Sequence, residues 1–567
     1  MPTLVQIGAG NIGRGFIAPT FAQAGWSVVL VDIDRRRIEA ARTRGRYTVT
    51  EVDNGGSRLV PVAPVTGVDA ADQDAVVDVL AACDLASTAV GLNALARLGP
   101  VLARGLIARW AAGRDTLDVL LCENGATADA ILREAVMSAL PAEQRARARA
   151  SLGIVRTSIG RMIPPGDEVD ALDIAVEPYA HLPVDRAGFV GAIPVVPHLE
   201  PRADFDLVLG QKLYLHNLTH ACLAYAGCAR GLATIPDCME DAALVAGARR
   251  AGEEASEALA RAHGGTAAGR ARVLAECTDL LEALFVRYRN RALADPVARV
   301  ARDPVRKLAV DDRLVGAARL CLAHGVQPKA ILAHILLACD HIVAADDPGA
   351  ALWRSLQGRG ALATIAAITK LPPEDPFMRA LDLSDRRRQA TQSMRAAGLV
   401  ITDPEADLVE IADFGLGRFE QFGLAIHVYV NTARCCAKEL VMLPGQICPE
   451  HRHPPIPGGA AEGGDPGKEE TFRVRQGEVH LFLPGHHKDG AERTFALGLV
   501  PEDKRDAVTV FKHVHLTPGS QYTLKPNTPH WFVAGTEGAI VSEFSTRSRD
   551  EADVFTDPAI VRVPDPA

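Results

Sequence analysis

The chain has 567 residues, which is too long for one hydrophobic core and indicates roughly two to four domains. Hydrophobic residues make up 48% and charged residues 23%, a composition that excludes extensive disorder. The formal net charge of -9, spread over so long a chain, speaks against a nucleic-acid or anionic-membrane partner. No signal-peptide pattern opens the sequence, and its 11 cysteines show no paired spacing, so we expect a cytoplasmic protein with reduced thiols.

Residues 1–200 alternate short Val, Leu and Ile runs with helical patterns. The strand-like runs are residues 4–7, 28–31, 85–89 and 119–121. Such alternation is typical of a parallel sheet wrapped by helices, so an α/β domain is predicted here.

Residues 201–385 lack strand patterns and carry long periodic stretches rich in Ala, Leu and Arg. These stretches are residues 207–226, 242–263, 271–292, 315–324 and 329–344. Their spacing predicts an all-α domain. The most apolar part, around 330–345, contains His334 and Asp340 and is too short and polar to span a bilayer. A charged segment follows, and residues 386–400 are predicted to form a linker.

Residues 401–567 change in texture again, with alternating runs separated by Pro and Gly turns. The runs include residues 425–430, 478–483 and 521–524. This pattern predicts an all-β barrel. The Pro- and Gly-rich segment 454–467 is predicted to be a loop.

A GxGxxG motif follows the first predicted strand. Its residues are Gly8, Ala9, Gly10, Asn11, Ile12 and Gly13. The glycines permit a tight turn, close approach of a pyrophosphate and close helix packing, which predicts a Rossmann dinucleotide-binding domain. Asp32 ends the second strand, where a carboxylate accepts hydrogen bonds from the ribose and repels a 2′-phosphate, so NAD is the expected cofactor.

Three arginines at residues 35–37 leave two interpretations open. They either accept the 2′-phosphate of NADP or form the solvated start of a helix. The second interpretation is favoured, because charged residues at a helix start usually face water.

Lys212, Asn217 and His220 are spaced so that they converge on one side of a helix, with His216 between them. Oxidation of a secondary alcohol needs a base for the hydroxyl proton, and a buried lysine with a lowered pKa serves near neutral pH. Asn217 and His220 would hold the resulting oxygen by hydrogen bonds. From spacing alone, surface and core roles for these residues stay open.

The same residues carry a resemblance to a known family. The GAGNIGRG loop and the K-x4-N-x2-H pattern occur together with residues 88–91 (TAVG), 122–124 (CEN), 161–165 (RMIPP) and 302–308 (RDPVRKL). Through about residue 385 the chain resembles the polyol-specific long-chain dehydrogenases, the mannitol dehydrogenases. The resemblance implies Lys212 as general base, Asn217 and His220 as substrate ligands, Asn124 near nicotinamide and substrate, and no catalytic metal in this part.

Two features leave the polyol open. The family usually has an acidic residue where this chain has Gly160, so one contact to a substrate hydroxyl is in doubt. Arg302, Arg306 and Lys307 either bind a sugar phosphate or meet solvent and carboxylates.

A second set of residues has the spacing of metal ligands. His451 and His453 lie two apart on a predicted strand and point to one side, and Glu470 and His530 follow. Three histidines and one carboxylate suit Mn, Fe, Zn, Co or Ni, and they are the ligand set of a cupin barrel. Buried structural histidines are the alternative, and Glu469 is a rival to Glu470.

The last domain resembles the D-lyxose ketol-isomerases over residues 400–562. The motifs are residues 413–417 (DFGLG), 429–432 (YVNT), 438–440 (KEL), 444–446 (PGQ), 448–455 (CPEHRHPP), 470–473 (ETFR), 527–532 (NTPHWF) and 555–558 (FTDP). The resemblance implies a Mn-dependent interconversion of D-lyxose and D-xylulose, with D-mannose and D-fructose as alternatives.

Three further residues have predicted roles in this isomerisation. Glu543 is the candidate base that moves a proton between two carbons of the sugar, and Lys438 and Arg473 are expected to hold substrate oxygens. A structural ion pair between Glu543 and Lys438 is the alternative.

Together these expectations describe a multidomain sugar enzyme with an α/β Rossmann domain (1–200), an all-α substrate domain (201–385), a linker (386–400) and an all-β cupin domain (401–567). Its partners would be small polyols and sugars, and because cupin barrels commonly pair, a homodimer is expected. The alternative is a working dehydrogenase with a non-catalytic sugar-binding or dimerising cupin module.

Overall fold

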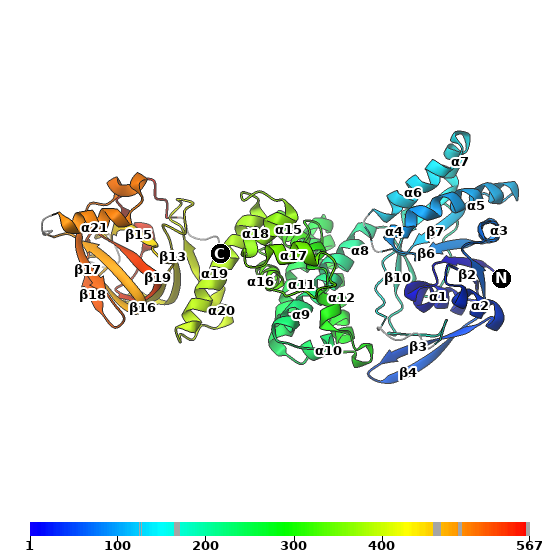
Figure 1. The fold of residues 1–567 in the computed structure, drawn as a ribbon, viewed down its shortest axis with the longest axis horizontal. Coiled ribbons are helices and arrows are strands. Elements are labelled where there is room, and N and C mark those ends of the chain that lie inside the picture. Colours follow the sequence, from blue (N-terminus) through cyan, green and yellow to red (C-terminus); the bar gives the residue numbers. More distant parts are fainter. Residues whose placement is uncertain (124, 126, 164–169, 457–465, 486–489, 563–567) are drawn as a thin grey trace. The chain divides into compact units, whose positions relative to one another are not determined.

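A computed structural model of the chain describes residues 1–123, 125, 127–163, 170–456, 466–485 and 490–562. The chain divides into two compact units, Met1–Leu371 and Pro372–Ala567. The predicted fold classes are confirmed, because a parallel sheet, a helical region and an antiparallel cupin-like sheet follow one another along the chain (Figure 1). None of the helices in the described part of the chain combines the length and apolar composition needed to cross a bilayer.

The parallel sheet of the first unit has six strands in the order β5-β2-β1-β6-β7-β8. Their bounds are Val65–Asp69, Ser27–Asp32, Thr3–Ile7, Leu85–Thr88, Leu117–Leu121 and Leu152–Arg156. Helices α3 (Gln73–Ala82), α5 (Gly99–Ala111) and α6 (Ala128–Ala139) share one apolar core with it. Strand order reverses between β1 and β6, so the carboxyl ends of these two strands flank the ligand crevice expected in such sheets.

A second, three-stranded sheet in this unit was not predicted from the sequence. Strands β3 (Tyr47–Asp53) and β4 (Gly56–Val62) form an antiparallel hairpin, and β9 (Ile174–Val176) pairs with β3. Buried and partly exposed residues alternate along β3, which is the pattern of a strand with one wet face.

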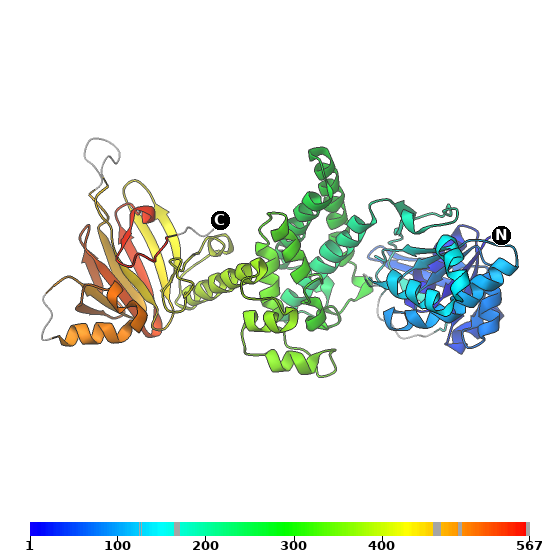
Figure 2. The same cartoon turned by 90° about the horizontal axis from the view of Figure 1, so that it is seen from above.

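The region after residue 205 is helical as predicted (Figure 2). Helices α8 (Phe205–Gln211) and α9 (Leu218–Ala229) are joined by the π-turn η5 (Lys212–Asn217), and α11 (Ala242–His263) and α12 (Ala267–Tyr288) follow. A Cβ added to Gly252 of α11 would lie 2.7 Å from Leu281 and 3.0 Å from Thr219. This glycine therefore lets three helices approach closely around the segment that carries Lys212.

The second unit contains a cupin-type antiparallel sheet built around two long strands. Its main strands are β13 (Leu424–Asn431), β14 (Cys436–Met442), β15 (Ile447–Arg452), β16 (Glu470–Leu483), β17 (Lys512–Leu516), β18 (Gln521–Leu524) and β19 (His530–Ser545). The register of β16 against β19 shifts on both sides of Gln476, and Gly477 has a φ of 71°. Such bulges bend long strands and let a sheet curl around an interior.

The charged segment predicted to serve as a linker lies largely within a helix. Helix α19 (Pro376–Ala396) contributes Ala390 and Met394 to an apolar cluster with Val409 and Val441. These apolar side chains pack onto the sheet of the second unit.

Candidate active sites

The glycine loop after β1 has the shape of a dinucleotide cradle. A Cβ on Gly8 would lie 2.5 Å from the Ala89 carbonyl oxygen, and one on Gly13 would lie 2.0 Å from the Gly8 carbonyl oxygen. A Cβ on Gly10 would meet no atom of the described chain within 4 Å. Gly8 and Gly13 thus permit close backbone packing, whereas Gly10 leaves open space where a pyrophosphate would approach, so the loop fits a dinucleotide.

Asp32 lies beside this loop. Its Oδ2 accepts a hydrogen bond of 2.6 Å from the backbone N–H of Ala9, the residue that precedes Gly10 and the helical start at Asn11 and Ile12. The Asp32 side chain therefore fixes the loop to the end of β2.

The three arginines that follow each face a carboxylate. Arg35 lies 3.0 Å from Asp69, and Arg36 and Arg37 lie 3.2 and 3.6 Å from Asp34. These contacts agree with the interpretation of the arginines as a charged helix start.

Asn124 lies outside the described residues. Its neighbour Glu123 is described and makes hydrogen bonds near the end of β6. The buried Glu123 carboxylate accepts hydrogen bonds from the Thr88 hydroxyl at 2.7 Å and from the Val90 N–H at 2.9 Å. Burial raises the pKa of Glu123. This carboxylate ties the end of β7 to the end of β6.

Lys212 lies in a buried polar cluster. Its Nζ is 2.9 Å from Nδ1 of the buried His216. His220 Nε2 lies 3.0 Å from an Asp295 carboxylate oxygen, and its ring stacks on Tyr288 with centroids 5.1 Å apart. Burial, and then the charge of Arg287, lower the pKa of Lys212 to about 7. A lysine in this state is ready to exchange a proton near neutral pH.

The π-turn determines the orientation of Lys212 and Asn217 relative to one another around the helix axis. In an ordinary α-helix, residues five apart are rotated by about 140° from one another. The π-turn spans these two residues and its wider turn places positions five apart above one another. Asn217, which is half-buried, is thereby brought to the side of the helix that carries Lys212.

Several polar residues around Lys212 were not identified from the sequence, chief among them Arg287. Its guanidinium lies 3.9 Å above the Tyr179 ring, is paired with Glu177 at 2.5 Å, and donates to the Gly160 carbonyl oxygen. A Cβ on Gly160 would lie 3.0 Å from Tyr179. The ring therefore occupies the space beside Gly160, where a larger side chain would have to displace it.

The predicted phosphate-binding candidates have partners of their own. Arg306 is paired with Asp303 at 2.8 Å, and Arg302 lies 3.7 Å from Asp346. Lys307 is buried, and burial lowers its pKa to about 8. The two arginines thus meet carboxylates, which was the second of the two interpretations.

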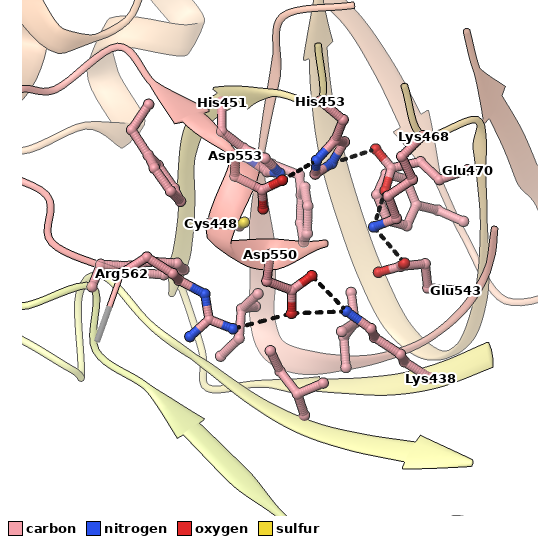
Figure 3. A pocket seen from close by; sticks show the side chains of 17 residues that line it. Lys438, Cys448, His451, His453, Lys468, Glu470, Glu543, Asp550, Asp553 and Arg562 are labelled. Carbon is pink, nitrogen blue, oxygen red and sulfur yellow. Dashed lines mark hydrogen bonds and ion pairs between the residues drawn. The ribbon is translucent and has the colours of Figure 1, made fainter. Parts of the chain in front are cut away.

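Three of the predicted metal ligands, His451, His453 and Glu470, line one pocket of the second unit (Figure 3). The fourth, His530, has a ring nitrogen within 4.8 Å of those of His451 and His453. His453 Nε2 and His530 Nε2 each lie 3.2 Å from Glu470 Oε1. All three atoms are buried and lack a hydrogen-bond partner among the described residues. Ligands 2.0–2.2 Å from one metal ion lie about 3 Å apart, so this arrangement fits a divalent ion.

The second ring nitrogen of each histidine, Nδ1, contacts an oxygen that orients the ring. The Nδ1 atoms of His451 and His530 lie 2.8 and 3.0 Å from backbone carbonyl oxygens, and that of His453 lies 2.5 Å from Asp553. Burial lowers the pKa of His530 to about 4, which leaves its ring neutral. Metal-binding histidines are commonly held in this way. Of the two glutamates considered, Glu470 lies in the cluster and Glu469 is exposed.

Lys468 is the main pocket residue that sequence reasoning missed. Its Nζ lies 2.8 Å from Glu470 Oε2 and 2.6 Å from Glu543 Oε1 (Figure 3). Lys438 instead donates to the Ser548 hydroxyl at 2.9 Å and to Asp550 at 3.0 Å. The alternative of a Glu543–Lys438 ion pair is therefore not what the structure shows, although the two residues are cross-strand neighbours.

Arg473 differs from its expected place in the pocket. Side chains alternate along β16, so Arg473 faces away from the side that carries Glu470 and Phe472. It is exposed and donates to Gln521 at 3.0 Å. A contact between Arg473 and a sugar in this pocket is thus excluded by strand parity.

Comparison with known proteins agrees with this geometry. Residues 2–197 match the mannitol dehydrogenase Rossmann domain, residues 208–375 the mannitol dehydrogenase C-terminal domain, and residues 408–565 the D-lyxose isomerase family. A D-lyxose ketol-isomerase from Thermofilum sp. is 51% identical over 183 residues, which are 32% of this chain and 96% of that protein.

The first unit has relatives of its own. A mannitol-1-phosphate 5-dehydrogenase from Bacillus licheniformis is 35% identical over 356 residues, 62% of this chain and 91% of that protein. The solved mannitol 2-dehydrogenase of Pseudomonas fluorescens, in complex with NAD and D-mannitol, shares the fold with a TM-score of 0.53 at 18% identity, over 70% of this chain and 94% of that one. The chain therefore belongs to the mannitol dehydrogenase family in its N-terminal part and to the D-lyxose isomerase family in its C-terminal part, and it is a fusion of the two enzyme domains.

Proposed function

We propose that this fusion is a bifunctional carbohydrate enzyme. Its first unit oxidises a polyol of the mannitol, mannitol 1-phosphate or arabinitol type with NAD, and its second unit is a Mn-dependent isomerase of D-lyxose and D-xylulose and of D-mannose and D-fructose. The proposal depends mainly on three buried atoms that can bind a metal: His453 Nε2, His530 Nε2 and Glu470 Oε1. Both nitrogens lie 3.2 Å from the oxygen, and none of the three makes a hydrogen bond with the described residues. The Lys468–Glu543 pair lies next to them.

In the dehydrogenase unit, the open side of Gly10 would receive the pyrophosphate and Asp32 the adenosine ribose. Lys212 would take the proton of the substrate hydroxyl as hydride leaves the same carbon for nicotinamide. Asn217 and His220 would hold the substrate oxygen, with His220 oriented by Asp295. Asn124, next to Glu123 in sequence, would approach the nicotinamide and substrate.

In the isomerase unit, His451, His453, Glu470 and His530 would hold the divalent ion, which when bound polarises the sugar carbonyl and acidifies the neighbouring C–H. Glu543 would take the proton from one carbon and return it to the next. Lys468, 2.6 Å from Glu543, would hold this carboxylate in position. Lys438, on the pocket wall with Asp550, would orient substrate hydroxyls.

The isomerase assignment is tested on the purified full chain after removal of metal. Ketose formation from D-lyxose, D-mannose and mannose 6-phosphate is measured with and without Mn²⁺. We expect turnover of the free sugars that returns with Mn²⁺. Absence of turnover on every sugar, with metal bound, would instead favour a non-catalytic cupin module.

The dehydrogenase assignment is tested with D-arabinitol, D-mannitol and mannitol 1-phosphate, each with NAD and NADP. We expect NAD to be preferred because the Asp32 carboxylate repels a 2′-phosphate. If the substrates are free polyols, the two units share a 2-ketose: D-arabinitol gives D-xylulose, and D-mannitol gives D-fructose. A strict requirement for the phosphate would break this link.

The pH dependence of the dehydrogenase is predicted from Lys212, whose pKa is lowered to about 7, first by burial and then by Arg287. Polyol oxidation needs the neutral amine, so kcat/KM should fall about tenfold per pH unit below pH 7 and level off above it. Ketose reduction needs the protonated amine and should fall above pH 7. Initial rates between about pH 5 and pH 9 check both directions, and an oxidation rate that ignores pH in this range contradicts the role of Lys212.

A Glu543→Gln variant separates proton transfer from metal binding. We expect kcat for isomerisation to fall about 100- to 10,000-fold because the amide cannot accept the proton, while metal content stays unchanged. Glu537→Gln, an exposed position on the same strand, is the matched control. Activity of Glu543→Gln close to that of the control would remove Glu543 from the mechanism.

A further inference from the structure

A second cluster of metal-ligand side chains lies outside the pocket, on strands β16 and β17. Glu478 and His480 belong to β16, and His513 and His515 to β17. His480 and His515 are direct cross-strand partners. Val479 and Leu481 alternate with these two residues along β16 and are part of the barrel core. Glu478 and His480 therefore point to the outer face of the sheet.

Three of these side chains, Glu478, His480 and His515, are within coordination range of one another, and His513 contacts His480. His480 Nδ1 lies 3.0 Å from His513 Nε2, and His515 Nε2 lies 2.8 Å from a Glu478 carboxylate oxygen. Donor atoms of Glu478, His480 and His515 all lie within 4.8 Å of one another. Separations near 3 Å are those of neighbouring ligands on one ion, and they resemble the 3.2 Å separations in the pocket.

Aromatic side chains hold these imidazoles in place. The Phe482 ring stacks on His513 with centroids 5.2 Å apart, and Phe495 of α21 (Ala491–Leu499) lies 5.4 Å from His480 and 5.0 Å from His513. The His480 and His515 rings stack with centroids 5.0 Å apart. The rings are therefore oriented before any ion arrives, which lowers the entropic cost of binding.

The cluster also has room and access. A Cβ on Gly535 would lie 2.4 Å from the Glu478 side chain, so the glycine leaves space for this carboxylate. The His515 and Glu478 side chains are 44% and 41% exposed, so an ion can enter from solvent.

We propose that Glu478, His480 and His515 bind a second divalent transition-metal ion, of the Zn²⁺, Ni²⁺ or Cu²⁺ class, with His513 orienting the His480 ring through its contact with Nδ1. Imidazole suits these ions and the carboxylate supplies compensating charge. The site is separate from the pocket, whose ligands lie inside the barrel. A bound ion would cross-link β16 to β17 beside α21 and stabilise this side of the barrel.

The test uses the metal-free full chain titrated with Zn²⁺ by calorimetry, with bound metal counted by mass spectrometry. We expect two ions per chain in the natural protein, one for each of the two ligand clusters found among the described residues. The double variant His480→Ala/His515→Ala should lose one ion and keep the other. Replacing the exposed His263 by alanine is the matched control and should lose none.

A second measurement isolates the outer site. In a His451→Ala/His453→Ala background, Cu²⁺ added at one equivalent should give an electron paramagnetic resonance signal with nitrogen couplings. Adding His480→Ala and His515→Ala together should remove those couplings. If the alanine variants unfold on thermal melting, Glu478→Gln, which keeps the side-chain shape, should weaken Zn²⁺ binding instead. Unchanged Zn²⁺ stoichiometry and affinity in the folded outer-site variants would overturn the proposal.

Discussion

Replacing Lys212 by methionine is expected to lower kcat/KM for polyol oxidation by about 1,000-fold, within the range typical for loss of a general base. Methionine fills the same buried space without an amine, so no group remains at the position of Nζ to take the hydroxyl proton. The residual rate should lose its dependence on pH near 7, because the group with a pKa of about 7 is gone. Steady-state kinetics across pH measure both effects.

Lys329→Met is the matched control, since Lys329 is exposed at the start of α16 (Lys329–Cys339). Its dehydrogenase kinetics should equal those of the natural protein. Isomerase activity should be unchanged in both variants. If Lys212→Met kept its oxidation rate and pH profile, another residue would have to be the base.

Replacing Glu470 by glutamine is expected to abolish metal-dependent isomerisation. The amide removes the negative ligand from a site whose other donors are imidazoles. Loss of a direct ligand should exceed the roughly 10- to 100-fold loss of metal affinity seen for outer hydrogen-bond partners. Bound metal after dialysis and ketose formation from D-lyxose are the two measurements, and His530→Ala should behave in the same way.

Glu469→Gln provides an unusually close control, because the adjacent Glu469 is exposed while Glu470 is buried. It should keep both metal and activity. Dehydrogenase kinetics should be equal in all three variants. Retention of metal by Glu470→Gln at the level of Glu469→Gln would show that Glu470 is not a ligand.

Local sequence patterns were sufficient for the glycine loop. Gly8 and Gly13 are required because a larger side chain would collide with the loop itself or with the chain beside it. The π-turn at Lys212 was not predictable, since it depends on how the surrounding helices pack. Arg287 was missed because it lies far along the chain from Lys212, whose pKa it helps to lower.

In the cupin unit, strand period explains both a success and an error. The two-residue spacing of His451 and His453 correctly placed both in the cluster with His530. The same period, counted from Glu470, places Arg473 on the outer face, whereas Lys468 precedes the first residue of β16 and reaches the pocket from outside the strand. Lys468 lies next to a segment predicted as loop, so strand period did not place it.

The sequence by itself determined the order of the fold classes and the fusion of two enzyme families, along with the cofactor loop and the residue types of a metal cluster. These features rest on local periodicity and short motifs, which fix backbone conformation within a few residues. Tertiary structure decided which charges pair: Glu543 with Lys468, Lys438 with Asp550, and His220 with Asp295. It also brought together the histidines of β16 and β17. Such pairings depend on strand register and helix packing between residues distant in sequence, and no local pattern encodes them.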